Sequence, residues 1–544
     1  MINTSTLPAI PLPASQPAAF NNCASAAGQQ FSALESWLAS APALHLPFHC
    51  VESQQQDKSR EVQRLLLQSH VRQRGNGDVG VALRAIGESD EALYTHRRLQ
   101  RRTLKTTVGA VHIDRFGYRR QGSASIHPLD EAMQLPARSF SYDLQKQLVK
   151  AAIQGPFRES TERILDSTGL VVAKRSLEEI LRDAAEDFDA FYAQRAPAPW
   201  QQTADILVAA VDGKGIPMVR PANQPRSIRP AKGPRPNGKK MATVAAVFTR
   251  GPWVRTPQQV VDSLFRTELK KDQKKTGQPV PPRPENKRVW ASLTKGKEAV
   301  MQEVLEEIQR RDPDCKKTRV ALTDGERALQ KLVDKKLKVT LIPDLFHVLE
   351  RAWKAADAFN PQGGPEAELW AKLACSRILE GNVSQVVKGL RQTVTKQGLF
   401  GSKRKTLTEV AAYFDNNKHR MRYHEYLAQG LPIASGPVEG ACKNLIKNRM
   451  ERSGMHWTES MAEAIVQLRA IYLNVNFLPY WSFHISKDQE RLSTRPLGRG
   501  RKVATPIPCS NPITSIISFS RKRLQPLTSA SPRPWSHMPD RSNC

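Results

Sequence analysis

The stretch ADILVAAVDGKG, residues 204–215, decides the fold. It contains an apolar run that ends in a carboxylate, Asp212. A continuous apolar run of this kind is typical of a strand that is buried on both faces of a sheet. A second run, MATVAAVFTRG at 241–251, follows a strongly basic loop over 220–240. The two runs therefore predict neighbouring buried strands joined by a basic connection.

Strands and helices alternate after these two runs. We expect a third strand at 252–256 and an amphipathic helix at 296–311. TRVALTDGERALQKLVDKK (318–336) and KVTLIPDLFHVLE (338–350) each indicate a strand that ends in an acid and continues into a helix. Three strands, then helix, strand, helix, strand and helix is the connectivity of a ribonuclease H-like α/β domain. In that fold the first strand lies beside the fourth, and the fifth lies beyond the fourth.

This strand order decides which acids can meet. Asp212 ends the first strand and Asp324 ends the fourth, so the two would lie side by side, whereas Asp344 ends the fifth strand and is one strand further away. Two carboxylates at adjacent strand ends can bridge divalent cations, and two-metal phosphoryl transfer holds two ions about 3.5–4 Å apart. We therefore choose Asp324 over Asp344 as the second metal ligand.

A third acid is expected on a helix that packs at the same end of the sheet. Glu439 lies in the first turn of the segment SGPVEGACKNLIKNRM, residues 435–450. The other charges of this segment are all positive: Lys443, Lys447 and Arg449. An ordinary ion pair between Glu439 and Lys443, worth about 0.2–0.5 kcal/mol, is the alternative. The context favours a metal ligand, because a site that binds a metal and a polyanion at once needs an acid among cations.

Composition favours a nucleic-acid partner. The chain has 82 Lys and Arg against 52 Asp and Glu, which gives a formal net charge of +30 and a pI near 10.0. Such an excess favours a polyanion, although charge that only maintains solubility is the alternative. The 7 cysteines form no CxxC pair, so neither a disulfide framework nor a zinc ribbon is predicted. We see no membrane span and no signal peptide, and expect a cytoplasmic protein.

The segment at 430–474, which contains Glu439, resembles the C-terminal signature of bacterial insertion-sequence transposases of the ISKra family, a branch of the DDE transposases in the retroviral integrase superfamily. Four further stretches are similar to that family: LDEAMQLPARSFSYDL (129–144), NKRVWASL (286–293), LTDGERAL (322–329) and DLFHVLE (344–350). The similarity covers roughly residues 108–497. It implies a DDE triad of Asp212, Asp324 and Glu439, in agreement with the strand-order argument.

The resemblance also implies a reaction. Two Mg²⁺ ions, for which Mn²⁺ can substitute, would be held by the triad, cut DNA at the ends of the element and join the freed 3′-hydroxyl to target DNA. Asp344 and His347 match a pattern of Cys or Asp, two residues and His that has an accessory role in the family; a core histidine is the alternative for His347. Pairing of two ends implies a homodimer or larger assembly on DNA, in the nucleoid. A catalytically inactive DNA-binding derivative and a nuclease without strand transfer are the competing hypotheses.

The rest of the chain completes the predicted organisation. Six segments are expected: a flexible arm (1–55), a mainly helical DNA-binding region (56–200) with a helix-turn-helix-like part at 157–190, the first part of the catalytic domain (201–347), an all-helical insertion (348–430), the catalytic helix and end of the core (431–490), and a basic disordered tail (491–544). The basic segment 96–120 indicates strands that either contact DNA or form a solvated face.

Several cations near these features are expected to contact DNA. They are Lys174 and Arg175 at the start of the second helix of the helix-turn-helix-like part, Lys214 after the first strand, and Lys443, Lys447, Arg449 and Arg452 on and after the catalytic helix. Trp457 lies beside the last of these and could stack on an unpaired base. A place in the core is the commoner use of a tryptophan.

Overall fold

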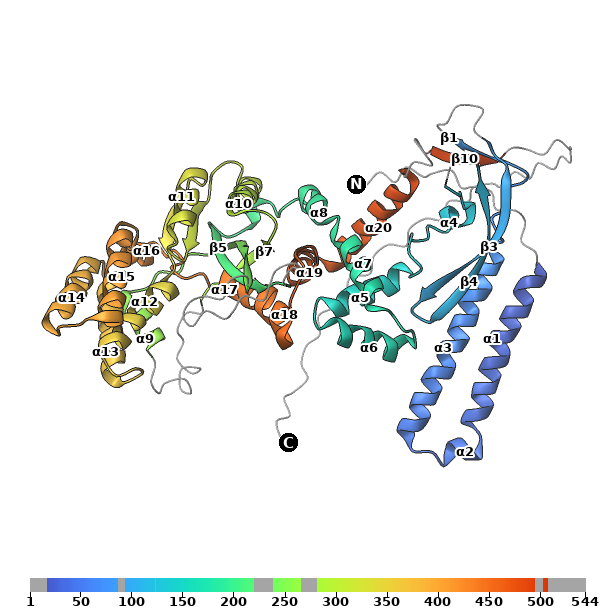
Figure 1. The fold of residues 1–544 in the computed structure, drawn as a ribbon, viewed down its shortest axis with the longest axis horizontal. Helices are drawn as coiled ribbons and strands as arrows, with labels where there is room; N and C mark the ends of the chain where they lie inside the picture. The colour runs from blue at the N-terminus through green and yellow to red at the C-terminus, as the bar shows by residue number, and fades with distance from the viewer. Residues whose placement is uncertain are drawn as a thin grey trace.

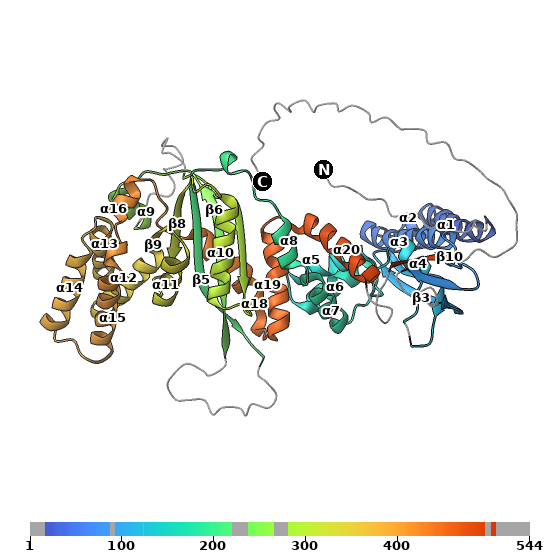
Figure 2. The same cartoon turned by 90° about the horizontal axis from the view of Figure 1, so that it is seen from above.

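The structure is a computed structural model that describes residues 17–86, 93–122, 124–219, 238–265, 281–494 and 502–506. The parts are arranged in a row, with N-terminal helices and a β-hairpin at one end, a bundle of helices at the other and a sheet between them (Figures 1 and 2). Within the described ranges, no helix has both the length and the apolar character that crossing a membrane requires.

The central sheet has five strands. They are β5 (Ile206–Pro217), β6 (Lys239–Arg250), β7 (Glu285–Ser292), β8 (Thr318–Thr323) and β9 (Thr340–Pro343). Their order in the sheet is β7-β6-β5-β8-β9, with β5 antiparallel to β6 and parallel to β8. The predicted neighbours are confirmed, since the first strand lies beside the fourth and the fifth lies at the edge. The protein is thus of mixed α/β class.

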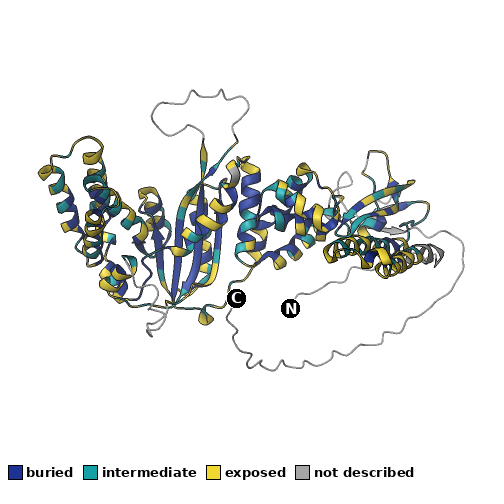
Figure 3. Cartoon of the chain, turned by 90° about the horizontal axis from the view of Figure 1, so that it is seen from below, coloured by how far each residue is buried: buried dark blue, intermediate teal, exposed yellow. Residues whose placement is uncertain are grey.

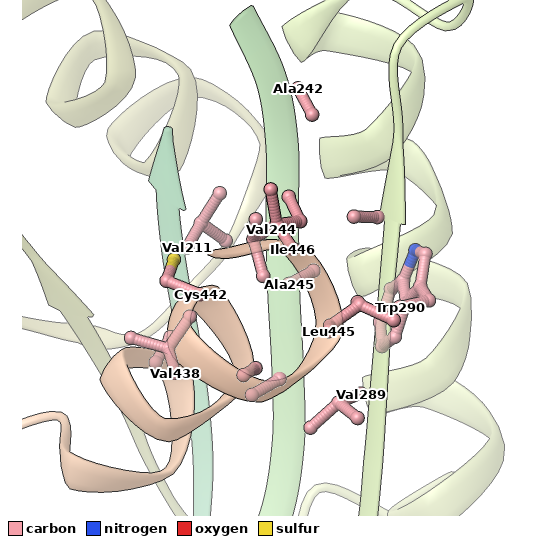
Figure 4. Packing of buried hydrophobic residues seen from close by; sticks show 14 of the residues in the cluster. Val211, Ala242, Val244, Ala245, Val289, Trp290, Val438, Cys442, Leu445 and Ile446 are labelled. Atoms are coloured by element: carbon pink, nitrogen blue, oxygen red, sulfur yellow. The ribbon is translucent and has the colours of Figure 1, made fainter. Parts of the chain in front are cut away.

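Helices cover both faces of this sheet, which explains the uninterrupted apolar runs. The residues from Ile206 to Val211 of β5 are all buried, although their side chains alternate between the two faces. Helix α10 (Lys297–Arg311) packs against β5 and β6, and α17 (Gly436–Ala441) packs with its continuation on the opposite face (Figure 4). Beyond Val211 the strand no longer pairs with β8, and β5 and β6 extend together as a ribbon to the pair Pro217 and Lys239 (Figure 2). The predicted basic loop joins them, and its residues 220–237 lie outside the described residues.

The predicted third strand is wrong. Residues 252–256 form no strand and lead into α9 (Pro257–Leu264), whereas the third strand, β7, forms at ENKRVWAS. Pro252 has no N–H to give to a ladder. The apolar residues of β7 are concentrated in its buried second half, behind an exposed polar start. Strand β7 therefore lacks the continuous apolar run that identifies β5 and β6 in the sequence.

Two groups of helices complete the central and C-terminal parts. Helix α11 (Arg327–Lys336) lies between β8 and β9, and β9 is followed by α12 (Leu345–Phe359), α13 (Pro365–Leu379), α14 (Val383–Lys396), α15 (Gly401–Asn417), η3 (Lys418–Arg420) and α16 (Tyr423–Ala428). After α17 come a π-helical turn, η4 (Cys442–Lys447), then α18 (Asn448–Met450), η5 (Arg452–Gly454), α19 (Glu459–Leu473) and α20 (Phe477–Thr494). The expectation of helices over 348–430 is confirmed.

The N-terminal part is more ordered than predicted. It contains α1 (Pro17–Leu38), α2 (Ala41–Leu44), α3 (Phe48–Gln73), β1 (Leu83–Ile86), β2 (Leu93–Tyr94), β3 (His96–Thr106), β4 (Gly109–Arg119) and α4 (Pro128–Ala132). Helices α1 and α3 lie side by side, so the predicted flexible arm is helical from Pro17 onward, and residues 1–16 lie outside the described residues (Figure 1). The many Ala residues of α1 account for this, because Ala is the strongest helix former.

The hairpin of β3 and β4 confirms the strands predicted in the basic segment. Its buried side chains Leu104, Val111 and Ile113 pack with Val71 of α3. The predicted C-terminal tail begins within α20, and a later part of it, β10 (Lys502–Pro506), pairs with β1. Residues 495–501 and 507–544 of that tail lie outside the described residues.

Between the hairpin and the sheet lie α5 (Tyr142–Ala152), α6 (Phe157–Thr168), α7 (Lys174–Ala185), α8 (Phe188–Gln194) and η1 (Trp200–Gln202). Helix α6 ends at Gly169, whose φ of +70° suits glycine, and α7 follows after a short turn. The helix pair predicted at 157–190 is therefore present. Its second helix buries Leu177, Ile180 and Leu181 and packs against α19, so its apolar face is used inside the protein. Buried residues are frequent in these helices, in the sheet and in the helices that follow it, whereas α3 is largely exposed (Figure 3).

Candidate active site

Three aspartates lie at one edge of the sheet. The parallel pairing of β5, β8 and β9 ends in register, since Val211 pairs with Thr323 and Thr323 with Pro343. Each of these residues is followed by an aspartate: Asp212, Asp324 and Asp344. Asp212 still pairs with Val244 of β6, so the prediction that Asp212 ends the first strand is wrong, because β5 continues in its ribbon with β6. In-register residues of parallel strands follow one another across the sheet, so Asp324 lies between the other two. The predicted adjacency of Asp212 and Asp324 is thus present in the backbone.

Asp212 is tied to the segment that carries Glu439. The Sγ of Cys442 donates a hydrogen bond to Oδ2 of Asp212 over 3.2 Å, and the Gly213 N–H donates to Oδ1 over 2.6 Å. Burial, with the charge of Asp212, raises the pKa of the Cys442 thiol well above its usual range. The thiol therefore stays a donor at neutral pH. Cys442 is at the start of the π-helical turn, a feature that is frequent at functional sites (Figure 4).

Asp324 is held from two directions. Its Oδ1 accepts a hydrogen bond from the Glu326 N–H over 2.9 Å, and its backbone oxygen accepts one from the hydroxyl of Tyr413 over 3.3 Å. Tyr413 belongs to α15, so the helical insertion contacts the strand end that carries the acid. Gly325 makes this contact possible, because its φ is +85° and a Cβ there would lie 2.6 Å from the tyrosine hydroxyl.

Asp344 has a structural role. Its side chain is buried, caps α12 by accepting from the Phe346 N–H over 2.8 Å, and accepts from both the backbone N–H, over 2.9 Å, and the hydroxyl of Ser435. Burial raises the pKa of this carboxyl to about 6, and the charge of Glu439 acts in the same direction. His347 is half-buried on α12, with Nδ1 3.3 Å from Glu350, so it is not a core histidine.

Glu439 is exposed in the first turn of α17. The pair with Lys443 that was the ordinary alternative is not found among the ion pairs of the described residues. The helix is fixed on either side of this residue, because Ser435 at its start contacts Asp344 and Cys442, after its last turn, contacts Asp212. The backbone at Glu439 is therefore positioned by hydrogen bonds to two of the three aspartates, Asp344 and Asp212.

The carboxylates do not form a closed ligand set. In the part of the chain that the structure describes, no three His, Cys, Asp or Glu side chains are grouped so that they could hold a metal ion. The donors themselves are of the kind that Mg²⁺ prefers, since all are carboxylate oxygens. Binding of an ion by Asp212, Asp324 and Glu439 thus requires these side chains to draw together.

Most of the predicted DNA-contacting cations are accessible. Lys443 and Lys447 are exposed on the helix of Glu439, and Lys214 is half-buried on β5. The other three are exposed or partly exposed and paired with acids: Lys174 with Glu178 at 3.7 Å, Arg175 with Glu179 at 3.2 Å, and Arg452 with Glu159 at 3.2 Å. Phosphate contacts by these three would have to compete with their carboxylate partners.

Arg449 and Trp457 are inside the protein. Arg449 is 1% exposed, its Nε donates to the Ala152 carbonyl over 2.8 Å, and its guanidinium lies 4.8 Å from the Trp457 ring. Burial lowers the pKa of Arg449 to about 9. Trp457 is buried as well, and its Nε1 donates to the Met450 carbonyl over 2.9 Å. The burial of Arg449 contradicts a DNA contact through its side chain, and Trp457 takes the core position named as the commoner alternative.

Three residues at the site are absent from the predictions: Cys442, Ser435 and Tyr413. The first two flank Glu439 at helical spacing, which is the signal that could have found them. Tyr413 is distant in the chain and has no local signal. The chain matches no known family model and no curated protein.

Proposed function

We propose that the protein is a DDE transposase that cuts DNA at the ends of an insertion sequence and joins them to target DNA. One observation carries the proposal. Asp212 and Asp324 directly follow Val211 and Thr323, the in-register residues at which the parallel pairing of β5 and β8 ends, and the helix of Glu439 is hydrogen-bonded to Asp212 through Cys442. Two carboxylates from adjacent strands and one from a helix packed beside them is the arrangement that the two-metal reaction needs.

The architecture supports a ribonuclease H-like catalytic core. Three antiparallel strands are followed by two parallel ones, and the helix with the third acid packs on the same sheet. An all-helical insertion separates the last strand from that helix. The chain order of these parts agrees with the resemblance to the ISKra family, whose motifs include the segments around Asp324 and Glu439.

The residues have separate roles in this proposal. Asp212, Asp324 and Glu439 would hold two Mg²⁺ or Mn²⁺ ions, which when bound supply an activated water or 3′-hydroxyl and stabilise charge on the phosphate. Cys442 fixes one oxygen of Asp212, which limits the rotation of that carboxylate. Asp344 fixes the start of α17 through its hydrogen bonds with Ser435. Because Asp344 is used in this way, the neighbouring Asp324 is the proposed metal ligand.

Charge around the site suits a DNA substrate. Lys443 and Lys447 are exposed on the same short helical segment as Glu439. The chain as a whole has a formal net charge of +30, and contacts from Lys and Arg to phosphates gain free energy by releasing counterions. The proposed partners are the ends of the element, target DNA and a second copy of the chain.

A second candidate function is a catalytically inactive DNA-binding derivative. The open arrangement of the carboxylates among the described residues favours it. A nuclease of the same fold without strand transfer would share the metal ligands and differ only in its products.

The test is strand cleavage and joining with Mg²⁺ on labelled DNA that flanks the coding sequence. Glu439→Gln removes the charge and keeps the shape, and Glu366→Gln, at an exposed residue of α13, is the matched control. We expect the wild type and the control to cut and join, and Glu439→Gln to bind DNA without cutting. Equal cleavage by Glu439→Gln would exclude Glu439 as a ligand. Cleavage without joining would favour the nuclease, and DNA binding without cleavage by the wild type would favour the inactive derivative.

A further inference from the structure

A second candidate site lies at the edge of the sheet opposite to the aspartates. It is a cavity of about 350 Å³. Thr249 near the end of β6 and Asn286 near the start of β7 line it, and both lie at the edge where β5 begins. The end of α8, the last turn of α10 and the turn between α19 and α20 form its other walls. The cavity therefore lies away from the candidate active site.

The lining of this cavity is strongly basic. Among its described lining residues, five are cationic and one is anionic. They are Arg195, Lys287, Arg288, Arg310 and Arg311 against Glu307. Basic residues in the last turn of a helix interact favourably with its dipole, which accounts for Arg310 and Arg311 on α10. Arg195 directly follows α8 and is placed in the same way, whereas Lys287 and Arg288 come from β7 and have no such explanation.

The single acid is shared by three arginines in the floor of the cavity. Glu307 is 5% exposed. Its oxygens accept from Arg288 and Arg310 over 2.5 Å each and from Arg311 over 2.7 Å. Burial alone would raise the pKa of Glu307, but the charges of Arg288 and Arg311 outweigh it and lower the pKa to about 2. One carboxylate neutralises one of three guanidinium groups, so the floor keeps an excess of positive charge.

Arg288 also has an unused donor. Its side chain is 12% exposed and lies 3.9 Å from the ring of Tyr192. The Nε of Arg288 is buried and has no hydrogen-bond partner among the described residues. At the rim, Arg195 and Lys287 are exposed, and neither forms an ion pair with a carboxylate in the part of the chain that the structure describes. The positive charge of the floor is thus compensated only in part by Glu307, and that of the rim is paired with no carboxylate of the described residues.

We propose that this cavity binds a phosphate group, either of a free nucleotide or of a nucleic-acid backbone. Guanidinium groups match the geometry of phosphate oxygens, and their attraction to an anion is stronger in a partly buried site than in water. The volume of about 350 Å³ lies within the range of small-molecule sites. The residues of the cavity are separate from Asp212, Asp324 and Glu439, so the site does not depend on the proposed catalytic function.

The first experiment is calorimetric titration of the full chain with inorganic pyrophosphate. The rim variant Arg195→Gln/Lys287→Gln removes two exposed cations, and its matched control is Arg163→Gln/Lys331→Gln, which removes two exposed cations outside the cavity. We expect the wild type and the control to bind alike and the rim variant to bind about tenfold more weakly, since hydrogen bonds to charged groups are lost. Equal midpoints of thermal unfolding for the two variants and the wild type show that both variants are folded.

Two further probes separate the sources of the phosphate. These are dAMP and a short single-stranded oligonucleotide. A loss of dAMP affinity in the rim variant, with oligonucleotide binding unchanged, identifies a free nucleotide as the ligand. A loss of oligonucleotide affinity with a smaller salt dependence identifies a nucleic-acid backbone. Equal affinity of the wild type and the rim variant for all three probes, or no binding of any probe by the wild type, overturns the proposal.

Discussion

Gly325→Ala should separate the helical insertion from the strand end that carries Asp324. Gly325 has a φ of +85°, a conformation that costs an L-residue roughly 1–2 kcal/mol. A Cβ there would lie 2.6 Å from the hydroxyl and 2.7 Å from Cε2 of Tyr413, so the ring has to move. The hydrogen bond from the tyrosine to the Asp324 carbonyl is then lost, at roughly 0.5–1.5 kcal/mol. We expect a total loss of about 1.5–3.5 kcal/mol in the free energy of unfolding.

Urea unfolding, followed by the helical circular dichroism signal, measures this loss. Gly389→Ala is the matched control, because Gly389 lies inside α14 and a Cβ there meets no atom within 4 Å. Ala in a helix interior should stabilise the control by about 0.5–1 kcal/mol. In a Tyr413→Ala background the cost of Gly325→Ala should fall to the backbone part alone. An unfolding midpoint of Gly325→Ala equal to that of the wild type would refute the close approach of α15 to this loop.

Three further predictions concern the residues around α17. The buried carboxyl of Asp344, with its pKa raised to about 6, should make the wild type lose about 2–3 kcal/mol of stability as the pH rises from about 4 to 6, because in this range the folded state still binds a proton that the unfolded state has lost. Asp344→Asn should lack this pH-dependent loss in urea unfolding at several pH values. Arg449→Ala should lower the free energy of unfolding by about 2–4 kcal/mol and leave DNA affinity unchanged, because Arg449 is buried. The double variant Lys443→Gln/Lys447→Gln should keep the stability. In a binding titration it should lower the slope of log affinity against log salt concentration by about 2. Cys442→Ala should raise the Mg²⁺ concentration for half-maximal cleavage about 10- to 100-fold, and Cys442→Ser, which keeps a donor, should recover part of it.

The strands differ in how well the pattern of apolar residues along the sequence predicts them. Strands β5 and β6 are buried on both faces over most of their length, so their apolar runs are continuous and easily found. Strand β7 is apolar only in its second half and was missed. A composition rich in small residues predicts a flexible arm over residues 1–55, but from Pro17 onward this arm is helical, because α1 packs along its length against α3.

The site was predictable to the extent that it depends on strand order. Asp212 and Asp324 could be paired because the connectivity fixes which strands are neighbours. The burial of Arg449 could not be predicted, since its partner is the end of α5, nearly three hundred positions earlier in the chain. The role of Tyr413 could not be predicted either, because its contact with the Asp324 carbonyl depends on how the helical insertion packs against the sheet. Contacts between distant segments leave no periodic signal in the sequence.

The hydrogen bonds around α17 make the role of Glu439 open to a clean test. Asp344 holds the start of the helix through Ser435, and Asp212 holds the following turn through Cys442. Both contacts use atoms other than the Glu439 side chain, which is exposed. A substitution at Glu439 therefore leaves the helix anchored on the sheet and changes only the group that faces solvent. Loss of cleavage in Glu439→Gln would then report on the missing carboxylate and not on a displaced helix.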